Sequence, residues 1–235
     1  AVLVTIEIDI ASQGLPNFIL VGLADRSLTE AKERVRAAIR NSAAEFPARK
    51  ITINMAPADL PKEGSTFDLA IALSVLLASG QVKADLTKTL LIGELSLDGL
   101  LRSVVGVLPL VLLAKKLQFE RVIVPSFNAK EAGLVDGINV FGCSSLTEVC
   151  QFISGRLPLD PQPLTNVDPL NEYYEVDFEH IYGQEQAKRA LVIAAAGGHN
   201  LLMTGPPGSG KSMLAKALPS ILPPLTLSEL LEVSQ

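Results

Sequence analysis

The chain contains 235 residues, of which 48% are apolar and 19% are charged, and its formal net charge is −5. This composition supplies enough apolar material for one or two packed domains and excludes a disordered chain. The negative charge argues against a globally basic nucleic-acid-binding protein, although it leaves room for a local basic face. No apolar run reaches the roughly 18 residues that a membrane span needs.

The cysteine and histidine content favours neither a disulfide scaffold nor a metal site. The two cysteines are Cys143 and Cys150, and the two histidines, His180 and His199, lie far from them in the sequence. A secreted disulfide-rich domain would need more cysteines. Because cysteine is among the most buried residue types, we expect two ordinary core or helix thiols in a cytoplasmic protein.

Strand-like and helix-like segments alternate along the first 155 residues. In chain order, apolar periodicity predicts strands at 2–10 and 18–21, a helix at 27–39, a strand at 50–55, a helix at 67–79, strands at 90–97 and 100–105, a helix from about 109 to 117, a strand at 121–124, a helix at 129–135, a strand at 138–141 and a helix at 146–153. Ser27 and Glu30 have the spacing of a capping box. Asp98-Gly99 predicts a hairpin turn. We interpret residues 1–155 as one domain.

Prolines then interrupt the periodic pattern. Pro158, Pro161, Pro163 and Pro169 fall in a stretch with few periodic apolar positions. Proline removes a backbone donor and biases the residue before it toward extended conformations. We therefore expect an inter-domain linker at 156–177 and a second domain at 178–235.

One segment of the second domain matches the nucleotide-binding P-loop at every defined position. The matching residues are Gly205, Pro206, Pro207, Gly208, Ser209, Gly210, Lys211 and Ser212. An apolar run at 200–204 predicts the strand before the loop, and 212–218 predicts the helix after it. This context predicts a phosphate site in which Lys211 reaches the β- and γ-phosphates of ATP and the Ser212 hydroxyl ligates Mg²⁺.

The residues around this loop resemble the magnesium-chelatase-type AAA+ ATPases. The resemblance is carried by 178–191, which includes Ile181-Tyr182-Gly183-Gln184, and by 197–202 and 213–215. In those proteins the Ile-Tyr-Gly-Gln stretch lies against the adenine. The resemblance therefore implies that Ile181 and Tyr182 contribute to a base pocket, with apolar packing at a domain edge as the alternative.

The first domain resembles the proteolytic domain of Lon-type proteases. The segments 61–69 and 93–99, followed by Val105-Gly106, carry this resemblance. It implies a two-layer α+β fold like that of ribosomal proteins, followed here by the start of a P-loop α/β module of AAA+ type. The overall fold class is therefore α/β.

The Lon resemblance places Thr66 at the nucleophile position and Leu108 at the position of the catalytic lysine. A Ser–Lys dyad requires a neutral lysine that takes the serine proton, and leucine cannot act as a base. The only other serine and lysine close enough in the sequence to replace this dyad are Ser65 and Lys62. We therefore expect no peptidase activity and interpret Thr66 as the cap of the helix that follows.

An inert Lon-like domain before a magnesium-chelatase-like module is the pattern of the ComM family. Further motifs at 14–16, 21–23, 54–61 and 144–146 resemble that family in the same order. The resemblance covers essentially the whole chain. It implies a homo-hexameric ring that uses ATP and Mg²⁺ to move branched or single-stranded DNA during the uptake and recombination of foreign strands.

An AAA+ module should also contain an acidic strand that holds the Mg²⁺ water, a sensor residue and an arginine finger. The residues after Ser212 contain none of these, because 227–233 has a helical pattern. We therefore interpret the chain as a truncated fragment that binds nucleotide weakly and does not hydrolyse it. A binding or oligomerisation module, within a chelatase-like or protein-remodelling ATPase, is the alternative to a DNA motor.

A contact with DNA is harder to locate. Lys32, Arg36 and Arg40 recur every four residues and would form a basic row on the first helix. Such a row could bind phosphates. A solvated helix face explains the same spacing, and the absence of interleaved aromatic residues argues against base stacking.

Overall fold

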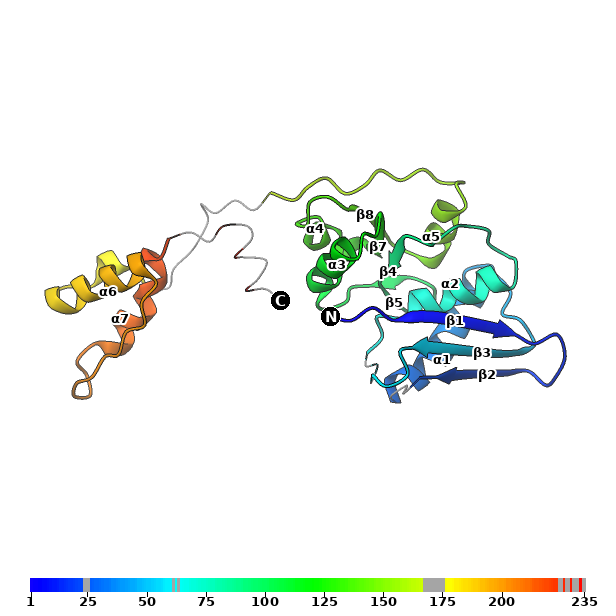
Figure 1. Cartoon of the computed structure of the whole chain (residues 1–235), viewed down its shortest axis with the longest axis horizontal. Helices are drawn as coiled ribbons and strands as arrows, with labels where there is room; N and C mark the ends of the chain where they lie inside the picture. Colours follow the sequence, from blue (N-terminus) through cyan, green and yellow to red (C-terminus); the bar gives the residue numbers. More distant parts are fainter. Residues whose placement is uncertain are drawn as a thin grey trace. The chain divides into compact units, whose positions relative to one another are not determined.

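The computed structural model describes residues 1–22, 26–60, 62, 64–166, 176–223, 226, 229 and 233, with the side chains of 26–29 outside this description. The chain forms two compact units, residues 1–166 and 167–233 (Figure 1). The first unit extends beyond residue 155, where the sequence predicted the domain to end.

The first sheet of the first unit has the strand order β1-β3-β2. Strand β3 (Lys50–Ala56) lies in the centre, antiparallel to β1 (Thr5–Ile10) and parallel to β2 (Asn17–Val21). Helices α1 (Arg26–Asn41) and α2 (Asp68–Ala78) contribute most of the core that packs on this sheet. The expected capping box of α1 depends on Ser27, whose side chain lies outside the described residues.

Alternation along β3 explains why one face of this sheet is buried. Ile51, Ile53 and Met55 are fully buried, whereas the residues between them are half-buried. Successive side chains of a strand point to opposite faces, so these three meet the apolar faces of α1 and α2. On α1 the matching residues are Ala31, Val35, Ala38 and Ile39, which are also fully buried.

The second sheet of this unit is parallel and has the order β4-β7-β8. Its strands are β4 (Thr89–Leu91), β7 (Arg121–Pro125) and β8 (Asn139–Cys143), and the helices around them are α3 (Val107–Lys116), α4 (Ala129–Ala132) and α5 (Leu146–Ile153), with the short η1 (Ser126–Asn128) before α4. The unit thus combines helices with parallel and antiparallel pairing, which confirms the predicted α/β class.

The single strand predicted at 90–97 is wrong, because the chain changes partners at Gly93. Ile92 N–H still donates to Ile123 O of β7, whereas Gly93 N–H donates to Thr66 O. Two short strands then form the predicted hairpin, β5 (Glu94–Leu95) and β6 (Leu101–Arg102). Gly99 in its turn has a φ of 85°, and a Cβ there would lie 2.3 Å from Ser42 Oγ.

An ion pair between the half-buried Arg34 and the fully buried Asp68 joins three elements of the first unit. Arg34 of α1 donates from Nε to Asp68 Oδ2 at 2.8 Å and from Nη2 to Oδ1 at 3.1 Å. The Leu95 N–H of β5 also donates to Asp68 Oδ2, at 3.3 Å. Burial raises the pKa of Asp68, while the hydrogen bond and charge of Arg34 act in the opposite direction. The same contact raises the pKa of Arg34.

The first part of the proline-rich segment belongs to the first unit. Gln162 N–H donates to Val140 O at 2.7 Å, and Thr165 N–H donates to Gly133 O at 2.9 Å. The Thr165 hydroxyl also donates to Lys130 O at 2.7 Å. These backbone bonds tie the segment to β8 and α4. They explain why the first unit continues to residue 166.

The second unit is helical in its described part. It contains η2 (Phe178–His180), α6 (Glu185–Gly197), α7 (Lys211–Ala217) and η3 (Leu218–Ile221). Its small core is formed by Ile181, Leu191, Leu214 and Ala217. None of the helices formed by the described residues of either unit is long and apolar enough to cross a bilayer.

The strand predicted at 200–204 is wrong, since those residues have no regular secondary structure. A strand is completed by hydrogen bonds to a neighbouring strand. The described residues of the second unit provide no such neighbour. Of the helix predicted at 227–233, most residues lie outside the described part of the chain.

Both cysteines are embedded in the first unit. Cys143 is buried at the end of β8, and Cys150 is half-buried in α5. Burial raises the pKa of Cys143 to about 12 and that of Cys150 to about 11, with the charge of Glu148 contributing at Cys143. No cluster of histidine, cysteine and acidic side chains suited to a metal occurs among the described residues.

Replacing Arg34 with methionine should strongly destabilise the first unit, because a fully buried carboxylate would lose its counter-charge. We expect a loss of about 3–5 kcal/mol in urea unfolding. Asp68→Asn should cost less, since asparagine keeps an acceptor for Leu95. Arg40→Met, at an exposed position of the same helix, serves as the control.

The cost of Arg34→Met should also depend on pH. Without Arg34, the already raised pKa of Asp68 rises further, so the folded state binds a proton more tightly than the unfolded state does. The free energy of unfolding of the variant therefore increases as the pH falls through the pKa of Asp68 in the folded state, and it decreases as the pH rises through that pKa. The difference in the free energy of unfolding between wild type and Arg34→Met should therefore become smaller as the pH is lowered from about 7 to about 5. A gap that widens on acidification would contradict the pairing.

The two thiols should be inert toward a thiol-reactive dye in the native chain at about pH 8, because the thiolate is the reactive species. Both should react in denaturant, where their pKa values return to the ordinary range of about 8.5. The Cys150→Ser variant reports on Cys143 alone. Rapid stoichiometric labelling of the native chain would show that these thiols are not held in the core.

Candidate functional site

The P-loop turns from an irregular segment into α7. Gly208 and Gly210 have φ values of 79° and 81°, in the left-handed region that disfavours side chains. Gly210 is the residue that precedes α7, and Leu214 N–H donates to Gly210 O at 3.0 Å. A Cβ at Gly208 or Gly210 would meet nothing within 4 Å. Backbone conformation, and not crowding, is therefore what requires glycine at these two positions.

The ammonium group of Lys211 lies inside the loop that precedes it. Its Nζ donates to Gly205 O at 2.9 Å, to Pro206 O at 2.8 Å and to Ser209 Oγ at 3.1 Å. The loop thus wraps around a positive charge and satisfies it with its own oxygen atoms. A phosphate oxygen that binds Lys211 must replace some of these three contacts.

A cavity of about 370 Å³ opens beside the loop. Its lining includes Gln184, Leu201, Thr204, Gly205, Pro206, Ser209 and Lys211. This volume lies within the range of about 300–1,000 Å³ that is typical of small-molecule sites. The structure therefore brings half of the predicted loop residues to one cavity. Pro207, Gly208, Gly210 and Ser212 belong to the loop without lining this cavity.

The residues expected at the base pocket lie elsewhere in the second unit. Ile181 is 2% exposed and packs in the small core, as the alternative interpretation expected, whereas Tyr182 is 90% exposed. Neither side chain lines the cavity beside the P-loop. Their contact with adenine stays a prediction.

Gln184 is a site residue that sequence reasoning missed. It lines the cavity, and its Nε2 donates to Ser209 O at 3.1 Å. The signal available in the sequence was its place at the end of the Ile-Tyr-Gly-Gln segment. The contact across 25 positions of the chain could not be inferred from that segment alone.

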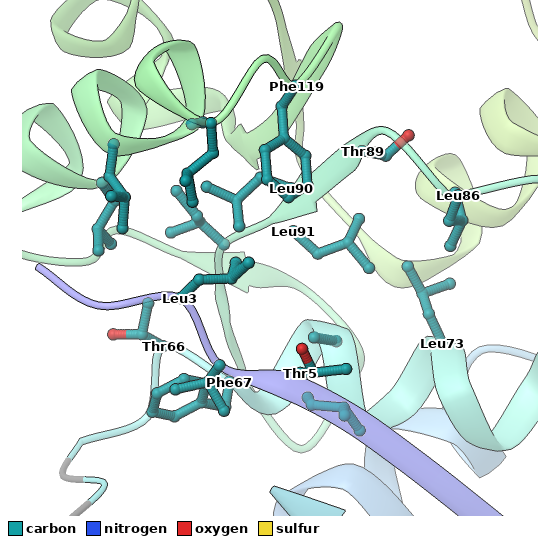
Figure 2. A pocket seen from close by; sticks show the side chains of 18 of the residues that line it. Leu3, Thr5, Thr66, Phe67, Leu73, Leu86, Thr89, Leu90, Leu91 and Phe119 are labelled. Carbon is teal, nitrogen blue, oxygen red and sulfur yellow. The ribbon is translucent and has the colours of Figure 1, made fainter. Parts of the chain in front are cut away.

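The first unit holds a larger, apolar cavity of about 680 Å³ at the position of the Lon-like nucleophile. Figure 2 shows Thr66 and Phe67 on one side of it, near Leu3 and Thr5, with Leu90 and Phe119 opposite. The residues that line this cavity are uncharged. Among the described residues, no acid, base or lysine therefore lines this cavity together with Thr66.

The position predicted for the Lon lysine is buried. Leu108 is 4% exposed, and its N–H donates to Glu131 Oε1 at 3.2 Å. The substitute pairing of Ser65 with Lys62 is not formed. The Ser65 hydroxyl donates to Glu94 Oε2, and the buried Lys62 ammonium donates to Pro57 O.

The prediction that Thr66 caps α2 is wrong. Phe67 occupies the N-cap position and makes no side-chain cap hydrogen bond. The Asp68 N–H at the start of the helix donates instead to Ser65 O at 3.1 Å. A backbone carbonyl thus takes the place that a threonine hydroxyl was expected to fill.

The basic row expected on α1 is not uniform. Arg36 is half-buried, with its guanidinium 5.3 Å from the centre of the Phe46 ring, and its Nε is buried without a partner in the described structure. Arg40 is exposed, and Lys32 is half-buried. Stacking on Phe46 gives Arg36 a packing role that a solvated phosphate contact would not need.

Two family models match the chain. The model described as subunit ChlI of Mg-chelatase matches residues 6–128, which is more than half of the chain. The model described as magnesium chelatase, subunit ChlI, matches residues 177–235, which contain the P-loop. The two matches fall in the first and second unit, respectively.

Relatives among curated proteins resemble nearly the whole chain. The protein named YifB of Salmonella typhimurium is 48% identical over 230 residues, covering 97% of this chain and 45% of the relative. The competence protein ComM of Haemophilus influenzae is 46% identical over 241 residues, covering 100% of this chain and 46% of the relative. The chain therefore spans about half the length of the curated relatives it matches.

A more distant similarity is to a Lon-type protease. Lon protease 2 of Bacillus subtilis is 29% identical over 133 residues, covering 56% of this chain and 24% of the protease. This match supports the Lon-like similarity that the sequence motifs indicated. The two family models, together with the similarity to ComM and YifB over nearly the whole of this chain, identify its family: the chain belongs to the magnesium-chelatase ChlI family, among the relatives named ComM and YifB.

Proposed function

We propose that this chain supplies the nucleotide-binding part of a ComM-like AAA+ ATPase. The observation that carries the proposal is Lys211, whose ammonium is enclosed by three oxygen atoms of the P-loop at the wall of a 370 Å³ cavity. The ligand that suits this arrangement is the polyphosphate of ATP. We further propose a cytoplasmic location, in line with the two free thiols.

The residues present fit a phosphate chain. Lys211 can exchange the carbonyls of Gly205 and Pro206 for phosphate oxygens without leaving the loop, because these contacts are hydrogen bonds to neutral acceptors. Gly208 and Gly210 allow backbone N–H groups to face an anion. The Ser212 hydroxyl, at the start of α7, is the residue we assign to Mg²⁺. Bound Mg–ATP supplies the phosphoryl group that water accepts in hydrolysis.

We propose that the Lon-like unit is not a peptidase. The predicted nucleophile position carries Thr66, the predicted lysine position carries Leu108, and the Ser65 hydroxyl donates to the Glu94 carboxylate instead of to a lysine amine. A nucleophilic hydroxyl needs an adjacent group that removes its proton. The unit is better suited to binding or oligomerisation.

The work that ATP drives is proposed from the relatives. The Haemophilus relative is named a competence protein. We propose that the intact protein assembles as a hexameric ring and moves branched or single-stranded DNA during natural transformation and recombination. The description of both family models as magnesium chelatase favours a second candidate, a chelatase-like or protein-remodelling ATPase in which this chain binds partners.

The test uses the intact protein with forked DNA as a stimulant. Lys211→Ala should reduce nucleotide binding and ATP hydrolysis by a factor of at least about 100, because charge-assisted bonds to the phosphates are lost. Lys216→Ala, in the same helix, serves as the control. Stimulation of wild-type hydrolysis by forked DNA is expected. A rate of ATP hydrolysis that forked DNA does not change would favour the second candidate. Unchanged ATP hydrolysis in the Lys211→Ala variant would refute the proposed nucleotide site.

A further inference from the structure

Gln184 adopts a backbone conformation that glycine would adopt at lower cost. Its φ and ψ are 59° and 36°, in the left-handed region, and it follows Gly183, whose φ is 70°. Non-glycine residues reach this region with strain from the Cβ atom. A glutamine at such a position is explained if its side chain makes a contact that glycine cannot make.

The side chain of Gln184 is not used to cap its own helix. Gln184 is the N-cap residue of α6, and its side chain makes no capping hydrogen bond to that helix. Its Nε2 reaches across to the P-loop instead and donates to Ser209 O at 3.1 Å. Both Gln184 and Ser209 line the cavity beside the loop.

Ser209 is also one of the three residues that accept a hydrogen bond from Lys211. The Lys211 Nζ donates to Ser209 Oγ at 3.1 Å, while the Ser209 backbone carbonyl receives the Gln184 amide. A Cβ at Gly205 would lie 3.2 Å from Ser209 Oγ, so Ser209 is also packed closely against the start of the loop. Gln184, Ser209 and Lys211 therefore form one chain of contacts from α6 to the lysine.

We propose that Gln184 is a positioning residue of the nucleotide site, which fixes the Ser209 carbonyl and with it the place from which Lys211 reaches the phosphates. This inference rests on the proposed nucleotide-binding function. Gln184 acts through the phosphate loop and not on the base. Its loss should therefore weaken the binding of ATP and GTP by the same factor, leaving the preference between them unchanged.

The experiment measures the affinity of the intact protein for fluorescent ATP and GTP analogues with Mg²⁺. Gln184→Met keeps the length of the side chain and removes the donor, while Gln184→Gly removes the donor and relieves the left-handed strain. Both should bind about three- to tenfold more weakly than wild type, the effect of one lost hydrogen bond. Gln186→Met, at an exposed position of the same helix, is the matched control.

The outcomes distinguish failure of the nucleotide site from failure of the positioning role of Gln184. If wild type binds nucleotide, Lys211→Ala does not and Gln184→Met binds as wild type does, the positioning role is refuted and the nucleotide site stands. If the ATP-to-GTP preference changes in Gln184→Met, the side chain contacts the base and the inference is overturned. If wild type binds neither analogue, the proposed function itself fails. A matched loss for both analogues, with an unchanged melting temperature in Gln184→Met, supports the inference.

Discussion

Burial of the Asp68 carboxylate is the constraint on which the arrangement of the first unit depends. Its oxygens accept from Arg34 of α1 and from the Leu95 N–H of β5, while Asp68 itself begins α2. A buried carboxylate without such partners would cost several kcal/mol. The three elements must therefore keep their mutual positions. This arrangement holds Thr66, just before α2, at the wall of the apolar cavity.

The two units differ in how much chemistry their residues can perform. In the first unit, the cavity beside Thr66 is lined by uncharged residues, and the Ser65 hydroxyl is bonded to Glu94. In the second unit, the bonds of Lys211 go to neutral oxygens of its own loop, which an anion can replace. The described residues of the first unit thus place no lysine beside Thr66, whereas the second unit has an available cation.

Much of the fold could be predicted because its signals are local. The alternation of β3 and the helical spacing of α1 show in the residues themselves, and the structure confirms both. The predicted strand at 90–97 failed because Gly93 leaves β7 and bonds to Thr66, a partner remote in the sequence. The predicted strand at 200–204 failed because strand formation depends on a neighbour and not on apolar content alone.

The P-loop motif could be recognised from sequence alone, since glycine, lysine and serine stand at fixed spacing within one short segment. The same reasoning excluded Leu108 as a base, because leucine has no titratable group. The pairing of Arg34 with Asp68, the stacking of Arg36 on Phe46 and the bond from Gln184 to Ser209 became visible only in the folded chain. Each of these contacts joins different segments of the chain, and side-chain type alone does not specify which partner folding brings within hydrogen-bonding or stacking distance.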